Sequence, residues 1–378
     1  MNKIPLCIPF TGEEEINAVS EVIKSGWYAH GPKNHEFEEM FAEYHGVKHA
    51  FSMNSCTSAI HLAVEGMGIT GEVIIPSFTF VATANAVITG GARPVFADIE
   101  YDTCNIDPAS IERLIGPETE AIMPVHYGGQ SADMTAIMQL AADHDLEVIE
   151  DTAETIGGTH RGKLTGSFST GCFSFYPTKN LTTGEGGMLT TDDDQLAGRV
   201  KALLAHGIDK STYEREDLEK SWFRSASRIG YNFRMSNILA AIGVEQMKKL
   251  PEMNWRRREN AQQLSAALQE FPEITPPTER AENKHVYQMY TIRVQGGIDR
   301  DSFVRGLNQR GVGASVHFYP PVHLMPPYQG SEFRSDSLNV TEQVMNEIVT
   351  LPMYPQMKGE DLDHIVNAIR ETISELIS

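Results

Sequence analysis

Short apolar runs alternate with helical periods over the first 150 residues, and this pattern limits the fold more than any other feature. The apolar runs are His49–Met53, Val73–Ile75, Pro94–Ala97, Ala121–Val125 and Leu146–Ile149. The amphipathic periods between them are Thr57–Met67, Thr79–Ile88, Asp107–Ile115 and Met134–His144. Strands that alternate with helices in this way predict an α/β fold with a mainly parallel sheet covered on both faces.

The pattern changes along the rest of the chain. A helical period runs from Met235 to Leu268 and is expected to break at Pro251, before the proline-rich segment Phe271–Ala281. Beyond that segment the sequence predicts two strands, two helices and no repeat: strands over His285–Val294 and Gly313–Phe318, and helices over Asp299–Asn308 and from Glu360 to the end. We therefore expect a large α/β domain over residues 1–250 and a smaller α+β domain over residues 251–378. At the other end, Thr11 and Glu14 predict a capping box for the first helix.

Charge and cysteine content exclude several classes of protein. The chain has 31 Lys and Arg against 51 Asp and Glu, a net charge of −20, which would repel nucleic acid or an anionic membrane. A bound phosphate would therefore need a local site. The four cysteines are scattered, no apolar run approaches the length of a membrane span, and Pro5 and Pro9 interrupt the N-terminal segment. These features favour a cytoplasmic protein with no membrane or nucleic-acid partner, and no histidine or cysteine spacing predicts a metal site.

Three predicted strand ends carry polar side chains, and ligands of open α/β sheets bind at such ends. The first strand runs into the turn Asn54–Ala59, which opens a helix; its hydroxyls suit a phosphate, although simple helix capping would explain them too. The strand over 146–149 ends at Asp151, and the strand over 172–176 leads to Lys179. Taken singly, each is also explained as a cap or a solvated loop residue.

Together the three strand ends meet the requirements of pyridoxal 5'-phosphate. That cofactor needs an amine, a carboxylate to keep its pyridine nitrogen protonated, and donors for its phosphate. Lys179, Asp151 and the turn over residues 55–58 would supply them, and Phe80 is an aromatic side chain available to cover the ring.

The sequence resembles the DegT/DnrJ/EryC1/StrS family of sugar aminotransferases nearly from end to end. The resemblance implies the fold-type-I architecture of aspartate aminotransferase. It rests on these segments, in order: Ser25-Gly26-Trp27, Gly31-Pro32, Asn54 to Ala59, Pro76 to Asn85, Pro124 to Tyr127, Glu150 to Ala153, Ser174 to Leu181, Gly184 to Gly187, Gly230 to Met235 and His317 to Pro320.

The resemblance also implies roles for single residues. Lys179 matches the lysine that forms the Schiff base, Asp151 the partner of the pyridine nitrogen, and Phe80 the aromatic that stacks on the ring. Thr57, Ser58 and Ser174 match phosphate ligands, and Asn232 matches a phosphate contact from the neighbouring subunit of a homodimer. Glu154 matches a residue near the cofactor face, and His317 and Tyr319 match sugar contacts.

The implied activity is transfer of the amino group of L-glutamate to a keto- or aldehyde-sugar in surface polysaccharide or lipopolysaccharide biosynthesis. Gly184 to Gly187 resembles the branch that acts on nucleotide-linked 4-keto-6-deoxy sugars; an alternative is the aminotransferase that forms 8-amino-3,8-dideoxy-octulosonate. A regulatory, non-catalytic member that binds nucleic acid is a competing reading, disfavoured by Lys179 and the acidic charge. A P-loop nucleotide hydrolase is a remote alternative, because Gly157 to Lys163 fits the loop pattern but Leu164 replaces the required hydroxyl.

Overall fold

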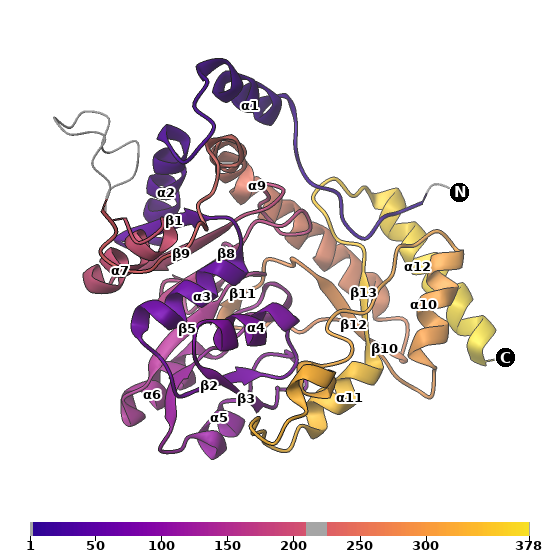
Figure 1. Cartoon of the computed structure of the whole chain (residues 1–378). Coiled ribbons are helices and arrows are strands. Elements are labelled where there is room, and N and C mark those ends of the chain that lie inside the picture. The colour runs from indigo at the N-terminus through magenta and orange to yellow at the C-terminus, as the bar shows by residue number, and fades with distance from the viewer. Residues whose placement is uncertain (1–2, 209–224, 378) are drawn as a thin grey trace.

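A seven-stranded sheet forms the centre of the protein, whose computed structural model describes residues 3–208 and 225–377 (Figure 1). Its strand order is β1-β9-β8-β5-β4-β2-β3. The strands are β1 (His49–Met53), β2 (Glu72–Pro76), β3 (Arg93–Ala97), β4 (Thr119–Ile122), β5 (Glu147–Asp151), β8 (Thr170–Ser174) and β9 (Gly187–Thr191). All neighbouring pairs from β8 to β3 are parallel, whereas β9 is antiparallel to both β8 and β1. The predicted α/β fold with a mainly parallel sheet is therefore confirmed.

Both faces of this sheet are covered, as continuous apolar strands require. Ile75 of β2 belongs to the core under α3 (Cys56–Met67), α4 (Val81–Thr89) and α7 (Asp194–Leu204). Its neighbour Ile74 points to the other face, where α5 (Pro108–Leu114) and α6 (Met134–His144) pack. On that same face, Phe173 of β8 packs against α2 (Pro32–His45) and α9 (Asn237–Leu268).

Two expectations about helix ends were wrong. Helix α1 (Glu13–Ser25) is capped one residue later than Thr11 and Glu14 suggested: the Gly12 N–H donates to Glu15 Oε2 at 2.7 Å. Helix α9 also continues through Pro251 instead of breaking there. Leu250 and Met253, on either side of the proline, are buried in the core, and this packing outweighs the backbone hydrogen bond that a proline removes.

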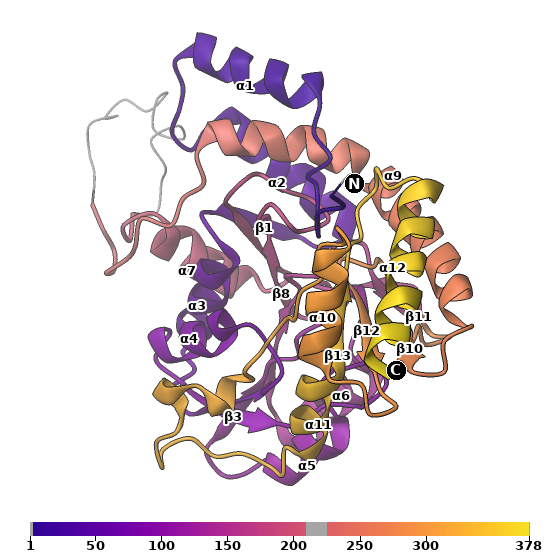
Figure 2. The same cartoon turned by 90° about the vertical axis from the view of Figure 1, so that its right-hand side faces the viewer.

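A second, antiparallel sheet of three strands lies in the C-terminal third, in the order β10-β12-β13. Its strands are β10 (Ile274–Thr275), β12 (Tyr290–Val294) and β13 (Ile348–Leu351), and the helices of this part are α10 (Arg300–Gln309), α11 (Asn339–Glu347) and α12 (Gly359–Ile377). Figure 2 shows α10 and α12 side by side over this sheet. The strand expected over residues 313–318 is absent; Ser315 makes only an isolated bridge to Thr350.

Helix α9 connects the two parts of the molecule. Its first half packs on the large sheet through Val244, and its second half joins the C-terminal core through Leu264. The boundary at residue 250 falls inside this helix, so the division into domains there stays a prediction.

The N-terminal segment lies against the C-terminal part in both views (Figures 1 and 2). Ile4 pairs with Val312, and the Met353 N–H donates to the Leu6 carbonyl at 3.2 Å. None of the described helices is long and apolar enough to cross a membrane.

Candidate active site

A cavity of about 410 Å³ lies at the carboxyl ends of β1, β2, β5 and β8, where the sequence placed its candidate residues. The C-terminal part contributes Gln288 and Met289 to its wall. Seven of the predicted site residues line the cavity: Thr57, Phe80, Asp151, Glu154, Ser174, Lys179 and His317. Strand ends far apart in the sequence are thus brought to one edge of the sheet.

Asp151, the last residue of β5, is 4% exposed and lines the cavity. One carboxylate oxygen accepts a hydrogen bond from Thr83 Oγ1 at 2.8 Å, and the other accepts from the Ala153 N–H at 3.2 Å. Burial raises the pKa of Asp151, while these two hydrogen bonds oppose the rise. A cationic group placed beside Asp151 would favour its charged form further.

Lys179 contacts Glu154 at the cavity wall. Its Nζ lies 3.3 Å from Glu154 Oε1, and both side chains are largely buried. The second oxygen of Glu154 accepts from the Gly128 N–H at 2.9 Å, which fixes the carboxylate in place. The amine is therefore held inside a shielded cavity by one carboxylate, and is not a solvated loop lysine.

The turn between β1 and α3 presents a helix N-terminus to the cavity. Ser55 caps α3 by accepting from the Ser58 N–H at 3.1 Å, and Thr57 lines the cavity. Ser58 lies in the same turn, but its hydroxyl donates to Asn54 Oδ1 at 2.7 Å and is outside the lining. Its role as a phosphate ligand stays a prediction. Ser174, at the end of β8, completes the group of hydroxyls at the cavity wall.

The other predicted residues are distributed around this centre. Phe80 is 62% exposed despite being aromatic, and it lines the cavity. His317 lines it too, with Nδ1 2.7 Å from Thr350 Oγ1, and burial lowers the pKa of its imidazole.

Asn232 and Tyr319 lie outside the cavity wall. Asn232 Oδ1 accepts from Arg234, and the Tyr319 ring stacks with Arg300 at 4.7 Å. Neither reaches the cavity of its own chain.

Sequence reasoning missed several residues at the site. Thr79, Thr83, Tyr176, Glu185 and Gln288 also line the cavity. The signal for the two threonines was their place directly after a strand: Thr79 lies in the loop that follows β2, and Thr83 lies in the first turn of α4. Nothing in the local sequence marks Gln288, because the C-terminal part brings it to the cavity only in the folded chain.

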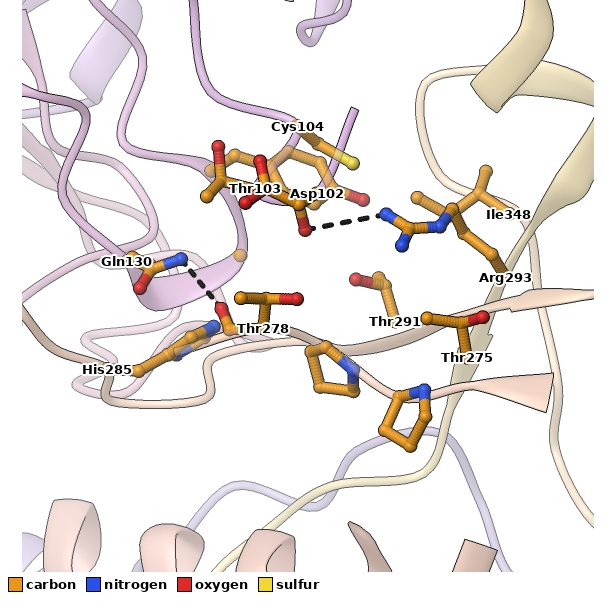
Figure 3. Close-up of a pocket in the computed structure, with 14 residues that line it drawn as sticks. Asp102, Thr103, Cys104, Gln130, Thr275, Thr278, His285, Thr291, Arg293 and Ile348 are labelled. Atoms are coloured by element: carbon orange, nitrogen blue, oxygen red, sulfur yellow. Dashed lines mark hydrogen bonds between the residues drawn. The ribbon is translucent and has the colours of Figure 1, made fainter. Parts of the chain in front are cut away.

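A second, smaller pocket lies between the loop after β3 and the C-terminal strands (Figure 3). Arg293 donates to the Asp102 carbonyl at 3.4 Å, and Gln130 Nε2 donates to the Thr278 carbonyl at 2.8 Å. Its volume of about 20 Å³ fits about one water molecule. It is too small for an organic substrate.

The residues of the P-loop alternative form a different structure. Residues 157–164 include the short strands β6 (Thr159–His160) and β7 (Lys163–Leu164), which pair with each other. A phosphate-binding loop would instead lead from a strand into a helix N-terminus. The P-loop reading was therefore wrong. Among residues 3–208 and 225–377, no group of three or more potential ligand side chains is arranged to hold a metal ion.

Comparisons with known proteins agree with this geometry. The sequence profile of the DegT/DnrJ/EryC1/StrS aminotransferase family matches residues 9–370. The chain belongs to this family. It is 40% identical to the spore coat polysaccharide biosynthesis protein SpsC of Bacillus subtilis, over 98% of this chain and 97% of that protein.

Solved structures of aminotransferases have the same fold. One of them is PseC of Helicobacter pylori, an aminotransferase involved in the biosynthesis of pseudoaminic acid. Its structure superposes on this chain with a TM-score of 0.90 at 30% sequence identity, and the match covers 99% of this chain and 100% of PseC. The structure of DesI, solved in the presence of its TDP-sugar product, has a TM-score of 0.88 at 28% sequence identity, and the match covers 99% of this chain and 95% of DesI. The fold-type-I architecture is confirmed, and the protein is an aminotransferase that uses pyridoxal 5'-phosphate.

The cavity fits this cofactor on its own chemistry. Asp151 accepts only two hydrogen bonds from the described residues, so its carboxylate keeps acceptor capacity for a pyridinium. Gly187 packs so closely under the α3 turn that a Cβ there would lie 2.3 Å from the Ser55 carbonyl carbon. A glycine at position 187 therefore lets β9 lie against this turn without displacing it, and the N-terminus of α3 can bind a phosphate there.

Proposed function

We propose that this aminotransferase moves the amino group of L-glutamate to the keto or aldehyde carbon of a sugar. The observation that carries the proposal is the placement of Lys179 and Asp151 in one cavity, at or just beyond the carboxyl ends of the neighbouring strands β8 and β5. Bound pyridoxal phosphate supplies an electron sink for the carbon that loses or gains a proton. Lys179 is the amine that holds the cofactor and, when free, the base that moves this proton.

The remaining residues bind and orient. Thr57 and Ser174, with the α3 N-terminus, would hold the phosphate, and Ser58 would support that turn. Phe80 would cover the ring, which explains why an aromatic is so exposed at the cavity. Glu154 would lie near the cofactor face, where its carboxylate would hold the Lys179 amine whenever that amine is free.

The proposed unit is a homodimer. Asn232 is exposed and lies outside the cavity of its own chain, so it would reach the phosphate of a second copy. His317 would contact the sugar from the C-terminal wall. Tyr319 would do so only at the cavity rim, because its ring is engaged with Arg300.

The proposed substrate is a nucleotide-linked 4-keto-6-deoxy sugar of surface polysaccharide biosynthesis. The relatives support the setting and the nucleotide: SpsC acts in spore coat polysaccharide biosynthesis, PseC in pseudoaminic acid biosynthesis, and DesI was solved with a TDP-sugar product. The 4-keto-6-deoxy part of the proposal rests on the resemblance of Gly184 to Gly187 to that branch of the family.

The test separates the two half-reactions. The holoenzyme given L-glutamate alone should form about one equivalent of 2-oxoglutarate per site and lose its visible absorption, as ping-pong transfer requires. Adding keto-sugars one at a time then identifies the acceptor, with the oxidised octulosonate as the competing arm. No 2-oxoglutarate without an acceptor would refute the mechanism.

Lys179→Ala should lose the visible absorption band and the glutamate half-reaction. Lys163→Ala is the matched control, because Lys163 lies on β7 and contacts the Phe168 ring outside the cavity. If the band persists in Lys179→Ala, the assignment of the lysine is wrong.

A further inference from the structure

Two buried threonines form a chain of hydrogen bonds that ends on Asp151. Thr79 and Thr83 are each 1% exposed, and their Oγ1 atoms are 2.8 Å apart. Thr83 Oγ1 lies a further 2.8 Å from Asp151 Oδ2. The two threonines come from the loop after β2 and the first turn of α4, whereas Asp151 ends β5, so the chain links two strand ends under the cavity.

The protons in this chain have one direction. A hydroxyl carries one proton and two acceptor lone pairs. When Asp151 is ionised it can only accept, so the Thr83 proton must point to Asp151. The contact between the two threonines is then made by the Thr79 proton. Each donor in such a series polarises the next, which strengthens the final bond to the carboxylate.

We propose that Thr83, polarised by Thr79, is the positioning residue that keeps Asp151 charged and oriented toward the pyridine nitrogen of the cofactor. This inference rests on the proposed role of Asp151. Thr83 holds one oxygen and the Ala153 N–H holds the other, so the carboxylate cannot rotate without losing both bonds. Its remaining lone pairs are thereby presented to the cavity.

The need for such a chain follows from the groups around Asp151. Burial and the negative charge of Glu154 disfavour the ionised carboxylate, and Lys179 favours it. The thiols of Cys56 and Cys172, which face Asp151 from α3 and β8, both have pKa values raised by burial and so remain neutral. Among the described residues, the donors that favour the charge through hydrogen bonds are Thr83 and the Ala153 N–H.

The test compares Thr83→Val, which keeps the shape but removes the hydroxyl, with Thr83→Ser, which restores it. Thr83→Val should weaken the binding of pyridoxal phosphate to the protein freed of cofactor by dialysis or refolding, and it should lower kcat of the holoenzyme. We expect each effect to be roughly 10- to 100-fold, because that is the contribution of one hydrogen bond to a charged group. The pH below which cofactor affinity falls and the holoenzyme's visible spectrum changes should rise by about one to two units. Thr83→Ser should restore both, and Thr79→Val should give a smaller shift in the same direction.

Asp151→Asn separates failure of this inference from failure of the proposed site. If Asp151→Asn leaves affinity and spectrum unchanged, the role of Asp151 is wrong and the inference falls with it. If Asp151→Asn is severe but Thr83→Val matches the wild type in affinity and in its pH profile, the hydroxyl chain is refuted. The double variant should show little beyond Asp151→Asn alone, because the two residues act through one carboxylate. A lowered melting temperature of Thr83→Val without a pH shift would point to packing and would also overturn the proposal.

Discussion

Glu150 is a buried carboxylate that organises the approach to the site. It is 0% exposed, next to Asp151 on β5. Its Oε1 accepts from the N–H groups of Phe168 and Ser169, at 2.8 and 3.0 Å. Its Oε2 accepts from the Gly166 N–H at 2.8 Å and from His126 Nε2 at 3.0 Å. Four donors thus converge on one side chain and hold the segment that leads into β8.

The Glu150→Gln substitution keeps the shape and replaces one oxygen by an NH2 group. His126 cannot adapt by changing tautomer, because its Nδ1 accepts from the Ala132 N–H at 3.1 Å and the proton must sit on Nε2. Either orientation of the amide therefore leaves two of the four donors without an acceptor: the N–H groups of Phe168 and Ser169, or the Gly166 N–H and His126 Nε2. Each such donor costs about 1–3 kcal/mol, so we expect a loss of about 2–6 kcal/mol in the free energy of unfolding.

The measurement is urea unfolding of the cofactor-free protein, followed by circular dichroism. Glu147→Gln is the control, because Glu147 lies on the same strand but is exposed, and its substitution should stay within about 0.5 kcal/mol. The two variants should have equal slopes against urea, so that midpoints report stability. A loss below about 1 kcal/mol for Glu150→Gln would refute the reasoning.

Two further predictions concern the phosphate turn and the response to acid. Gly187→Ala should weaken pyridoxal phosphate binding in a fluorescence titration, because its Cβ would meet the backbone at Ser55, whereas Gly198→Ala, with open space, should bind normally. Burial lowers the pKa of His45 to about 4 and of His285 to about 3, so both stay neutral in the folded protein while an unfolded histidine gains its proton near pH 6.5. The contribution of these two histidines to the free energy of unfolding is therefore fully present above pH 6.5, and it falls toward pH 4 by about 2.7 kcal/mol per pH unit for the pair. In thermal melts across that range, His45→Leu should show about half of this pH dependence. An unchanged pH dependence would contradict the assignment.

The large sheet and the centre of the site could be predicted because their signals are local. Each apolar run is bounded by turn residues, and strand ends in a parallel sheet meet at one edge. Lys179 and Asp151 needed only that rule to be brought together. The resemblance then added roles that spacing alone leaves open, such as that of Phe80.

Other features could not be predicted, because they depend on packing between distant segments. Pro251 stops a helix by its own chemistry, but α9 is held on both sides of it by buried residues. Residues 313–318 have a strand-like composition, yet only Ser315 pairs with the sheet, through a single bridge to Thr350 on the edge of β13 that faces away from β12. Thr79 and Thr83 gain their meaning only when β5 places Asp151 beside them.

The pairing of the chain's first residues with its last third sets an order of events during synthesis. Ile4 and Leu6 leave the ribosome long before their backbone partners at Gly311, Gly313 and Met353. At about 5–20 residues per second, these partners emerge roughly 15 to 70 s later. Ile4 and Leu6 therefore remain without these backbone partners during that time, and the full set of contacts can form only after Met353 has left the ribosome.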